Sequence, residues 1–183
     1  PYPACIVKGD DFRGGYLATS HLIELGARRI AFISGPLDCN IYIDRYAGFE
    51  KAMQQKGVPV LHHLMAYQEL NADNARRAMH RFFSKKPYPD AIFAANDLSA
   101  LTALQFAREI GIDVPGELRI MGYSNDPRSA IVTPSISTIN QFPVKIGKAV
   151  VRELLKILQE GQPVSIEQAP VITPIELIRR MST

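Results

Sequence analysis

Polar side chains that could hold a small molecule follow four of the predicted strands, at the point where each strand ends. They are Arg45 (after a Gly-Pro turn), Asn96 with Asp97, Ser124 with Asn125 and Asp126, and Asn140 with Gln141. In an open α/β sheet, ligands bind outside the carboxyl ends of the strands. These guanidinium, amide, hydroxyl and carboxyl groups together therefore favour a polar small-molecule site at one edge of a sheet.

The same residues also have structural explanations. Asn and Asp are good helix N-caps, and three of these residues suit that role: Asn96, Asp97 and Asp126. Arg45 could form an ion pair with Asp44 or Glu69. Taken singly, each residue is open to either interpretation, and only the four groups together favour a ligand site.

Catalytic motifs are missing from the sequence. It contains no glycine-rich dinucleotide fingerprint, no phosphate-binding loop, no paired-cysteine zinc motif and no Gly-x-Ser-x-Gly elbow. The four histidines have no convergent carboxylates: His21, His62, His63 and His80. We therefore expect no catalytic residue, no metal site and no cofactor, and we do not predict an enzyme.

The composition is that of an ordinary globular protein. Of the 183 residues, 46% are hydrophobic and 21% are charged, a mixture that argues against a disordered chain. The net charge of +3 comes from scattered basic residues, so no dense nucleic-acid-binding stripe is predicted. Two cysteines without metal-type spacing, Cys5 and Cys39, fit a reducing compartment, and no apolar run approaches the length that spans a bilayer.

Short apolar, β-branched runs alternate with amphipathic stretches along the chain. The runs predict strands at 5–8, 29–34, 61–66, 91–95, 119–123 and 137–140. Between them, apolar residues repeat at spacings of three and four, which predicts helices. This alternation is typical of an α/β fold in which helices cover both faces of a mostly parallel sheet.

Capping residues predict where the helices begin and end. The predicted starts are Asp10 or Asp11, Asp44, Asn71, and Asn96 or Asp97. The predicted ends are Gly26, Gly57, Gly111 and Gly161. A long helix at about 143–160 precedes an extended tail at 171–181 that Pro174 interrupts. We therefore expect the chain to return to a layer that it had left, in two subdomains joined by several crossings.

Five stretches distributed between residues 10 and 139 are specific in combination. They are residues 10–36 (DDFRGGYLATSHLIELGARRIAFISGP), 45–49 (RYAGF), 89–100 (PDAIFAANDLSA), 114–123 (VPGELRIMGY) and 133–139 (TPSISTI). In this combination the chain resembles the lactose-repressor/galactose-repressor (LacI/GalR) family of bacterial transcription regulators. The resemblance implies a two-lobed α/β fold like that of type I periplasmic binding proteins, with parallel sheets flanked by helices.

The resemblance also implies a division into lobes. Residues 1–34 and 139–162 would belong to a first lobe that is incomplete in this chain, and residues 35–138 and 163–183 would form the second lobe. The chain would cross between lobes at Ser34, Gly35 and Pro36. The DNA-reading headpiece and the opening of the first lobe are absent from these 183 residues, so we expect the natural protein to be longer.

By the same resemblance, the effector would lie between the lobes. Arg45 would anchor it, and Asn96 and Gln141 would contact it. Ser124 stands where many family members have an acidic residue, and this change favours an anionic or partly apolar effector. The remaining candidates would shape specificity or line the cleft: Cys39, Ile41, Leu70 and Arg13.

The function implied is that of an effector-sensing domain in a cytoplasmic bacterial repressor without catalytic activity. A sugar, sugar phosphate or sugar acid would control operator binding by a homodimer, with no membrane partner. The helix from Leu98 and the segment 126–132 are candidates for the dimer contact. The alternative is an exported solute-binding protein of a sugar transporter, which shares the two-lobed fold, and an enzyme on the same scaffold is a third possibility.

Overall fold

The computed structural model describes residues 4–160 and 169–183, and it divides them into two compact units. The larger unit comprises residues 11–140 and 177–183, and the smaller one comprises residues 1–10 and 141–176. Each unit is an α/β structure with parallel strands, as the sequence predicts.

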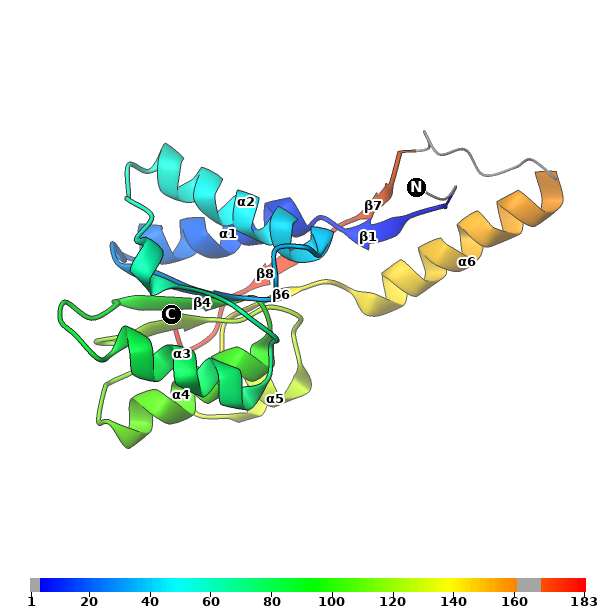
Figure 1. The fold of residues 1–183 in the computed structure, drawn as a ribbon. Coiled ribbons are helices and arrows are strands. Elements are labelled where there is room, and N and C mark those ends of the chain that lie inside the picture. Colours follow the sequence, from blue (N-terminus) through cyan, green and yellow to red (C-terminus); the bar gives the residue numbers. More distant parts are fainter. Residues whose placement is uncertain (1–3, 161–168) are drawn as a thin grey trace. The chain divides into compact units, whose positions relative to one another are not determined.

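The larger unit is built on a four-stranded parallel sheet with the strand order β3-β2-β4-β5. Its strands are β2 (Ile30–Ser34), β3 (Met65–Tyr67), β4 (Ala91–Ala94) and β5 (Arg119–Met121). Every residue of β2 and β4 is buried, because helices cover both faces of the sheet. Figure 1 shows one pair of helices on each face of this sheet, which gives a three-layer unit.

The first helix pair consists of α1 (Asp11–Glu24) and α2 (Asn40–Gln55), and the second of α3 (Ala72–Phe82) and α4 (Asp97–Glu109). Helices α1 and α2 approach closely because both carry glycines at the contact. A Cβ on Gly15 would overlap the carbonyl oxygen of Arg45, and a Cβ on Gly48 would overlap the carbonyl oxygen of Phe12. The glycines thus bring the α2 backbone against α1, and Arg45 lies at this contact.

Three further elements complete the larger unit. The short helix α5 (Pro127–Ile131) follows β5, and β6 (Thr138–Asn140) pairs with β8 (Glu176–Ile178) in a separate two-stranded sheet. The C-terminal tail then lies against β5, because Ser182 Oγ donates to the carbonyl oxygen of Ile120 at 2.6 Å and the Ile120 amide donates to the Ser182 carbonyl at 2.9 Å. The end of the chain is therefore an integral part of the core.

The smaller unit contains β1 (Val7–Gly9), α6 (Pro143–Glu160) and β7 (Val171–Thr173). Strands β1 and β7 pair in parallel, so the beginning of the chain and a segment near its end share one sheet. The predicted return of the chain to an earlier layer is therefore confirmed.

Most predicted helix ends are confirmed. Gly26, Gly57 and Gly111 follow helices with φ values of 97°, 66° and 74°, the left-handed conformation that glycine adopts without strain. Asn71 caps α3, where its side chain accepts a hydrogen bond from the Asn74 amide. The predicted end at Gly161 lies outside the described residues.

Two predicted boundaries are wrong. Helix α2 begins at Asn40, with Cys39 as an N-cap that makes no side-chain capping bond, so Asp44 lies inside the helix and not at its start. Half of the predicted strand at 61–66 is a 3₁₀ helix, η1 (His62–Leu64), and β3 begins directly after it. The first error arises because the N-cap position of α2 is occupied by Cys39, a residue type that does not predict a cap.

The predicted crossing between lobes also differs from the structure. The 10–34 segment was expected in the first lobe, yet α1 packs on α2, and β2 pairs with both β3 and β4 inside the larger unit. The division falls between Asp10 and Asp11, between Asn140 and Gln141, and between Glu176 and Leu177. Strand β7, which was expected in the second lobe with residues 163–183, therefore lies in the smaller unit. The turn at Gly35 and Pro36 therefore lies within one unit and is not a crossing.

Candidate functional site

Three of the four predicted polar strand ends lie in the larger unit, where the parallel strands of its four-stranded sheet finish together. Strand β2 leads to the turn before α2, β4 leads to Asn96, and β5 leads to Ser124. In-register pairing of Ile33 with Ala94 brings the first two of these ends side by side. The sheet topology therefore gathers at one edge the residues that the sequence places far apart.

Arg45 is the centre of a buried polar cluster at this edge. Its side chain is 6% exposed, and its Nε donates to Oδ1 of Asp11 at 2.9 Å. Its Nη1 donates to the carbonyl oxygen of Ala95 at 2.7 Å. The guanidinium carbon also lies 3.7 Å from the centroid of the Tyr123 ring. The Arg45 side chain thus contacts Asp11 on α1, Ala95 at the end of β4 and Tyr123 after β5.

Asp11 and Tyr123 complete the cluster. The Tyr123 hydroxyl donates to Oδ1 of Asp11 at 3.2 Å, so one carboxylate oxygen accepts from both Arg45 and Tyr123. Burial raises the pKa of Tyr123, which keeps its hydroxyl protonated and able to donate at neutral pH. Because Asp11 balances the guanidinium charge, the three side chains form a compact group without net charge.

The ion pair between Arg45 and Asp11 is a residue contact that the sequence interpretation missed. The sequence suggests Asp44 or Glu69 as ion-pair partners of Arg45, and the structure adds Asp11, which lies 34 positions away on α1. The two residues meet only because Gly15 and Gly48 let α1 and α2 approach closely. No local spacing signals such a contact.

Asn96 and Asp97 link the end of β4 to two neighbouring loops. Asn96 caps α4 by accepting from the Ser99 amide at 2.9 Å, and its Nδ2 donates to the carbonyl oxygen of Leu70 at 3.2 Å. Its capping role is confirmed, and the same side chain also fixes the Leu70 backbone. Asn96 and Leu70, both predicted as ligand residues, therefore lie next to each other.

Asp97 is 1% exposed and holds the loop after β5 in place. Its carboxylate accepts from the Asp126 amide at 2.6 Å and from the Thr138 hydroxyl at 2.7 Å. Burial raises the pKa of Asp97, and the hydrogen bonds from Thr138 and Asp126 oppose that rise. One carboxylate thus ties the start of α4 to the β5–α5 loop and to β6.

The β5–α5 loop has an unusual backbone at the predicted site residue. Ser124 and the following Asn125 have φ values of 115° and 55°, a region that non-glycine residues rarely adopt. The Ser124 amide donates to the carbonyl oxygen of Ile139 at 2.8 Å, and the Asn125 side chain accepts from Arg180 at 2.7 Å. The loop is held in this conformation by the surrounding strands and tail, a pattern that recurs at functional sites.

The remaining predicted residues are located as follows. Cys39 is half-buried and precedes α2, Ile41 lies in its first turn and is 39% exposed, and Arg13 is exposed on α1. Gln141 is half-buried and is the first residue of the smaller unit. The structure therefore groups Arg45, Asn96, Leu70 and Ser124 with one sheet edge, and it leaves the ligand role of all eight residues a prediction.

Two kinds of feature are absent from the described part of the chain. Among its side chains, no three His, Cys, Asp or Glu residues are grouped so that they could hold a metal ion. No helix among the described residues is both long and apolar enough to cross a bilayer.

Comparison with known proteins gives one consistent family. Residues 19–183 match the model of the periplasmic binding protein-like domain. The repressor PurR of Haemophilus influenzae is 32% identical over 96% of this chain, and the PurR of Escherichia coli is 35% identical over 87%. The matches cover 52% and 47% of those proteins, so the chain spans about half the length of these curated relatives.

Solved structures agree with this result. The transcriptional regulator CelR in complex with cellobiose is 30% identical and matches all of this chain and 55% of its own, with a TM-score of 0.90. A LacI-family regulator from Enterococcus faecium with bound ribose is 26% identical, with a TM-score of 0.84 over all of this chain and 66% of its own. Both confirm the fold class that the sequence predicts.

Proposed function

Because this chain belongs to the periplasmic binding protein-like domain family, in the form found in LacI-family regulators, we propose that it is the effector-binding domain of a bacterial transcriptional repressor. The observation that carries the proposal is the match of almost the whole chain to repressors and regulators of this one family. The polar strand ends around Arg45 supply a site of the kind that such a domain needs.

The site is proposed to bind a small polar molecule, a sugar or a sugar derivative. Two similar regulators have been solved with cellobiose and with ribose, which are neutral sugars. The charge of Arg45 is balanced by Asp11, so the cluster does not require an anionic ligand. The serine at position 124, where many family members have an acidic residue, suggests an anionic ligand. The balanced charge of Arg45 and Asp11 favours a neutral ligand instead.

Control of DNA binding is proposed to follow from differential affinity. A ligand that binds one arrangement of the two lobes more tightly would shift the protein toward it, and the reciprocal effect on operator affinity follows by linkage. The operator would be read by a headpiece that is not among these 183 residues. We propose that the domain acts in a cytoplasmic homodimer through α4 and α5, and sedimentation of the full-length protein as a monomer at micromolar concentration would contradict this.

An exported solute-binding protein is not favoured as the alternative, because the relatives described above are repressors and regulators. The same relatives are not enzymes, which supports a binding role without catalysis. Sequence upstream of residue 1 in the natural gene distinguishes the two binding proteins, since a helix-turn-helix supports the repressor and a signal peptide supports the exported protein.

The proposal is tested by a thermal-shift screen of the full-length protein with neutral sugars, sugar phosphates and sugar acids. We expect a neutral sugar such as cellobiose or ribose to raise the Tm, since ligands that bind only the folded state stabilise it. A matched operator-binding assay must then show that the same compound changes DNA affinity. A compound that stabilises the protein without any effect on operator binding would contradict the regulatory role.

A further inference from the structure

A pocket lies at the amino-terminal ends of the strands in the four-stranded sheet, opposite the strand ends described above. Arg29 directly precedes β2, Tyr88 precedes β4, and Glu117 precedes β5, and all three line this pocket. Its volume is about 650 Å³, within the range of small-molecule sites. None of the residues assigned above to the effector site lines it, so it is a separate feature of the larger unit.

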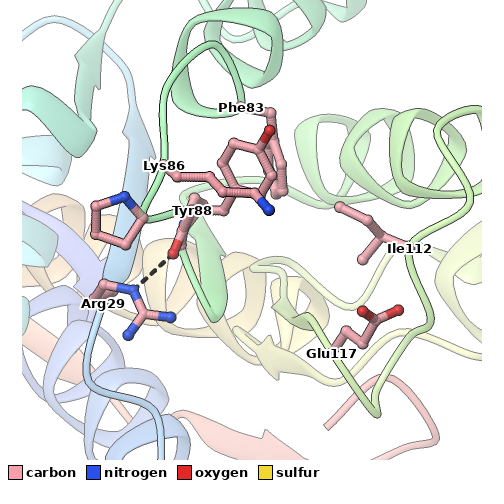
Figure 2. Close-up of a pocket in the computed structure, with 8 residues that line it drawn as sticks. Arg29, Phe83, Lys86, Tyr88, Ile112 and Glu117 are labelled. Atoms are coloured by element: carbon pink, nitrogen blue, oxygen red, sulfur yellow. Dashed lines mark hydrogen bonds between the residues drawn. The ribbon is translucent and has the colours of Figure 1, made fainter.

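One wall of the pocket is aromatic. The rings of Phe83 and Tyr88 lie with their centroids 5.1 Å apart and their planes tilted by 42°. Figure 2 shows these two rings next to each other, with the side chain of Ile112 on the other side of the hollow. A flat apolar group could therefore pack between the rings and the aliphatic side chain.

Two cationic side chains, Lys86 and Arg29, line the pocket beside this aromatic wall, and they differ in how far nearby carboxylates balance their charge. The Lys86 ammonium lies 5.6 Å from the centroid of the Tyr88 ring, and no ion pair of Lys86 is found in the described part of the chain. The Arg29 guanidinium lies 3.7 Å from the Asp90 carboxylate, which already balances part of its charge. Lys86 therefore supplies an uncompensated positive charge beside an aromatic surface.

Among the described residues that line the pocket, the one carboxylate, Glu117, already accepts a hydrogen bond. Glu117 Oε2 accepts from the Asp113 amide at 3.0 Å, and Figure 2 shows Glu117 on the side of the hollow opposite Lys86. An anion near Lys86 would thus be separated from the negative charge of Glu117. The pocket favours a ligand with one acidic end and an apolar body.

Hydrogen bonds hold the walls in place before any ligand binds. Arg29 Nε donates to the carbonyl oxygen of Tyr88 at 2.7 Å, and the Arg28 and Arg29 amides donate to the Asp90 carboxylate at 2.9 to 3.1 Å. A preformed pocket saves the ordering cost that a mobile loop would add to binding.

We propose that this pocket binds a small organic anion with an aromatic body. Its acidic group lies beside the ammonium of Lys86, and its ring packs on Phe83 and Tyr88. The ligand class follows from the neighbouring cation and aromatic rings alone, so the proposal stands whether or not the effector assignment at the other edge is correct.

The test uses 1-naphthyl phosphate as the probe and 1-naphthol as its neutral counterpart, each titrated calorimetrically into full-length protein. We expect the phosphate to bind at least about fivefold more tightly than the naphthol, the effect of one charge contact near a protein surface. Lys86→Met should weaken binding of the phosphate by about fivefold and leave binding of the naphthol unchanged. Raising the salt concentration should weaken binding of the phosphate alone.

Matched controls make the result specific. Lys85→Met removes the neighbouring exposed lysine, which does not line the pocket, and it should change the affinity less than twofold. Tyr88→Leu should weaken both probes, with an unchanged Tm showing that the fold is retained. Asn96→Asp reports on the other sheet edge and should leave both affinities unchanged.

Three results would overturn the proposal. They are the absence of binding at millimolar 1-naphthyl phosphate, an equal effect of Lys85→Met and Lys86→Met, and a loss of probe binding in Asn96→Asp.

Discussion

Replacement of Asp97 is the sharpest structural test of how the site is held together. The carboxylate is 1% exposed and accepts two hydrogen bonds, from the Asp126 amide and from the Thr138 hydroxyl. Asp97→Ala leaves both donors without their acceptor, and each unsatisfied buried donor costs about 1–3 kcal/mol. We therefore expect Asp97→Ala to lower the free energy of unfolding by about 3–4 kcal/mol.

The conservative variant Asp97→Asn should lower the free energy of unfolding by less than Asp97→Ala does. Asp97→Asn retains one acceptor oxygen for Thr138 but turns an NH₂ group toward the Asp126 amide, or the reverse, so one of the two bonds is lost. We expect a loss of about 1–2 kcal/mol, close to the cost of one orphaned donor. The assay is urea unfolding of the full-length protein, followed by two probes to check for a single transition.

Asp73 provides a matched control, because it is also an Asp in the first turn of a helix that follows an Asn N-cap, but it is exposed. Asp73→Ala should cost no more than about 0.5 kcal/mol, as is usual for surface positions. The reasoning is refuted if Asp97→Ala costs less than about 1 kcal/mol, or no more than Asp73→Ala.

The pH dependence of the same variant has a defined sign. Burial raises the folded-state pKa of Asp97 above 3.8, so the folded protein binds this proton more readily than the unfolded chain. The contribution of Asp97 to stability therefore falls as the pH rises from 3.8 through the raised pKa. The stability difference between the wild type and Asp97→Asn should shrink between pH 4 and pH 7, and a growing difference would contradict the assigned direction.

Three further perturbations have expected outcomes. Gly15→Ala should destabilise the protein by at least about 2 kcal/mol in urea unfolding, because its Cβ would overlap the Arg45 backbone, whereas Gly147→Ala, in an open part of α6, should be neutral or stabilising by up to about 1 kcal/mol. Arg45→Met should lower the free energy of unfolding by about 3–5 kcal/mol, because it leaves the buried Asp11 carboxylate without its cationic partner. In a double-mutant cycle, adding Asp11→Asn should recover at least about 1 kcal/mol of that loss. Burial lowers the pKa of His21, and the charge of Arg179 lowers it further, so the protein should lose stability as the pH falls below 6.5. His21→Gln should remove this loss of stability when thermal unfolding at pH 7.5 is compared with that at pH 5.5.

Local patterns were sufficient for the regular elements of the fold. The strands at 29–34 and 91–95 were predicted to within one residue, because each is a buried apolar run bounded by polar or glycine residues. The glycines after α1, α2 and α4 were identified as helix ends from residue type alone. These features depend on neighbouring residues, and neighbouring residues are what a sequence pattern records.

Contacts between distant segments could not be predicted in the same way. Asp11 and Arg45 meet because two helices approach closely at glycines, and Asp97 and Thr138 meet across 41 positions. The division of the chain at Asp10 depends on which strands pair with β2, and apolar runs do not specify their partners. Tyr123 was therefore identified as part of a family motif but not as the ring beneath the Arg45 guanidinium.

The claim that the carboxyl edge of the larger unit binds the effector is tested most directly by calorimetric titration of the neutral sugar that raises the Tm most in the screen. Asn96→Asp keeps an oxygen to cap α4 and removes the amide donor, and Lys86→Met alters only the opposite edge of the sheet. We expect Asn96→Asp to weaken binding of that sugar at least about tenfold, the effect of losing one well-placed hydrogen bond, while Lys86→Met leaves it unchanged. Equal affinity of the wild type and Asn96→Asp would contradict the assignment of the site.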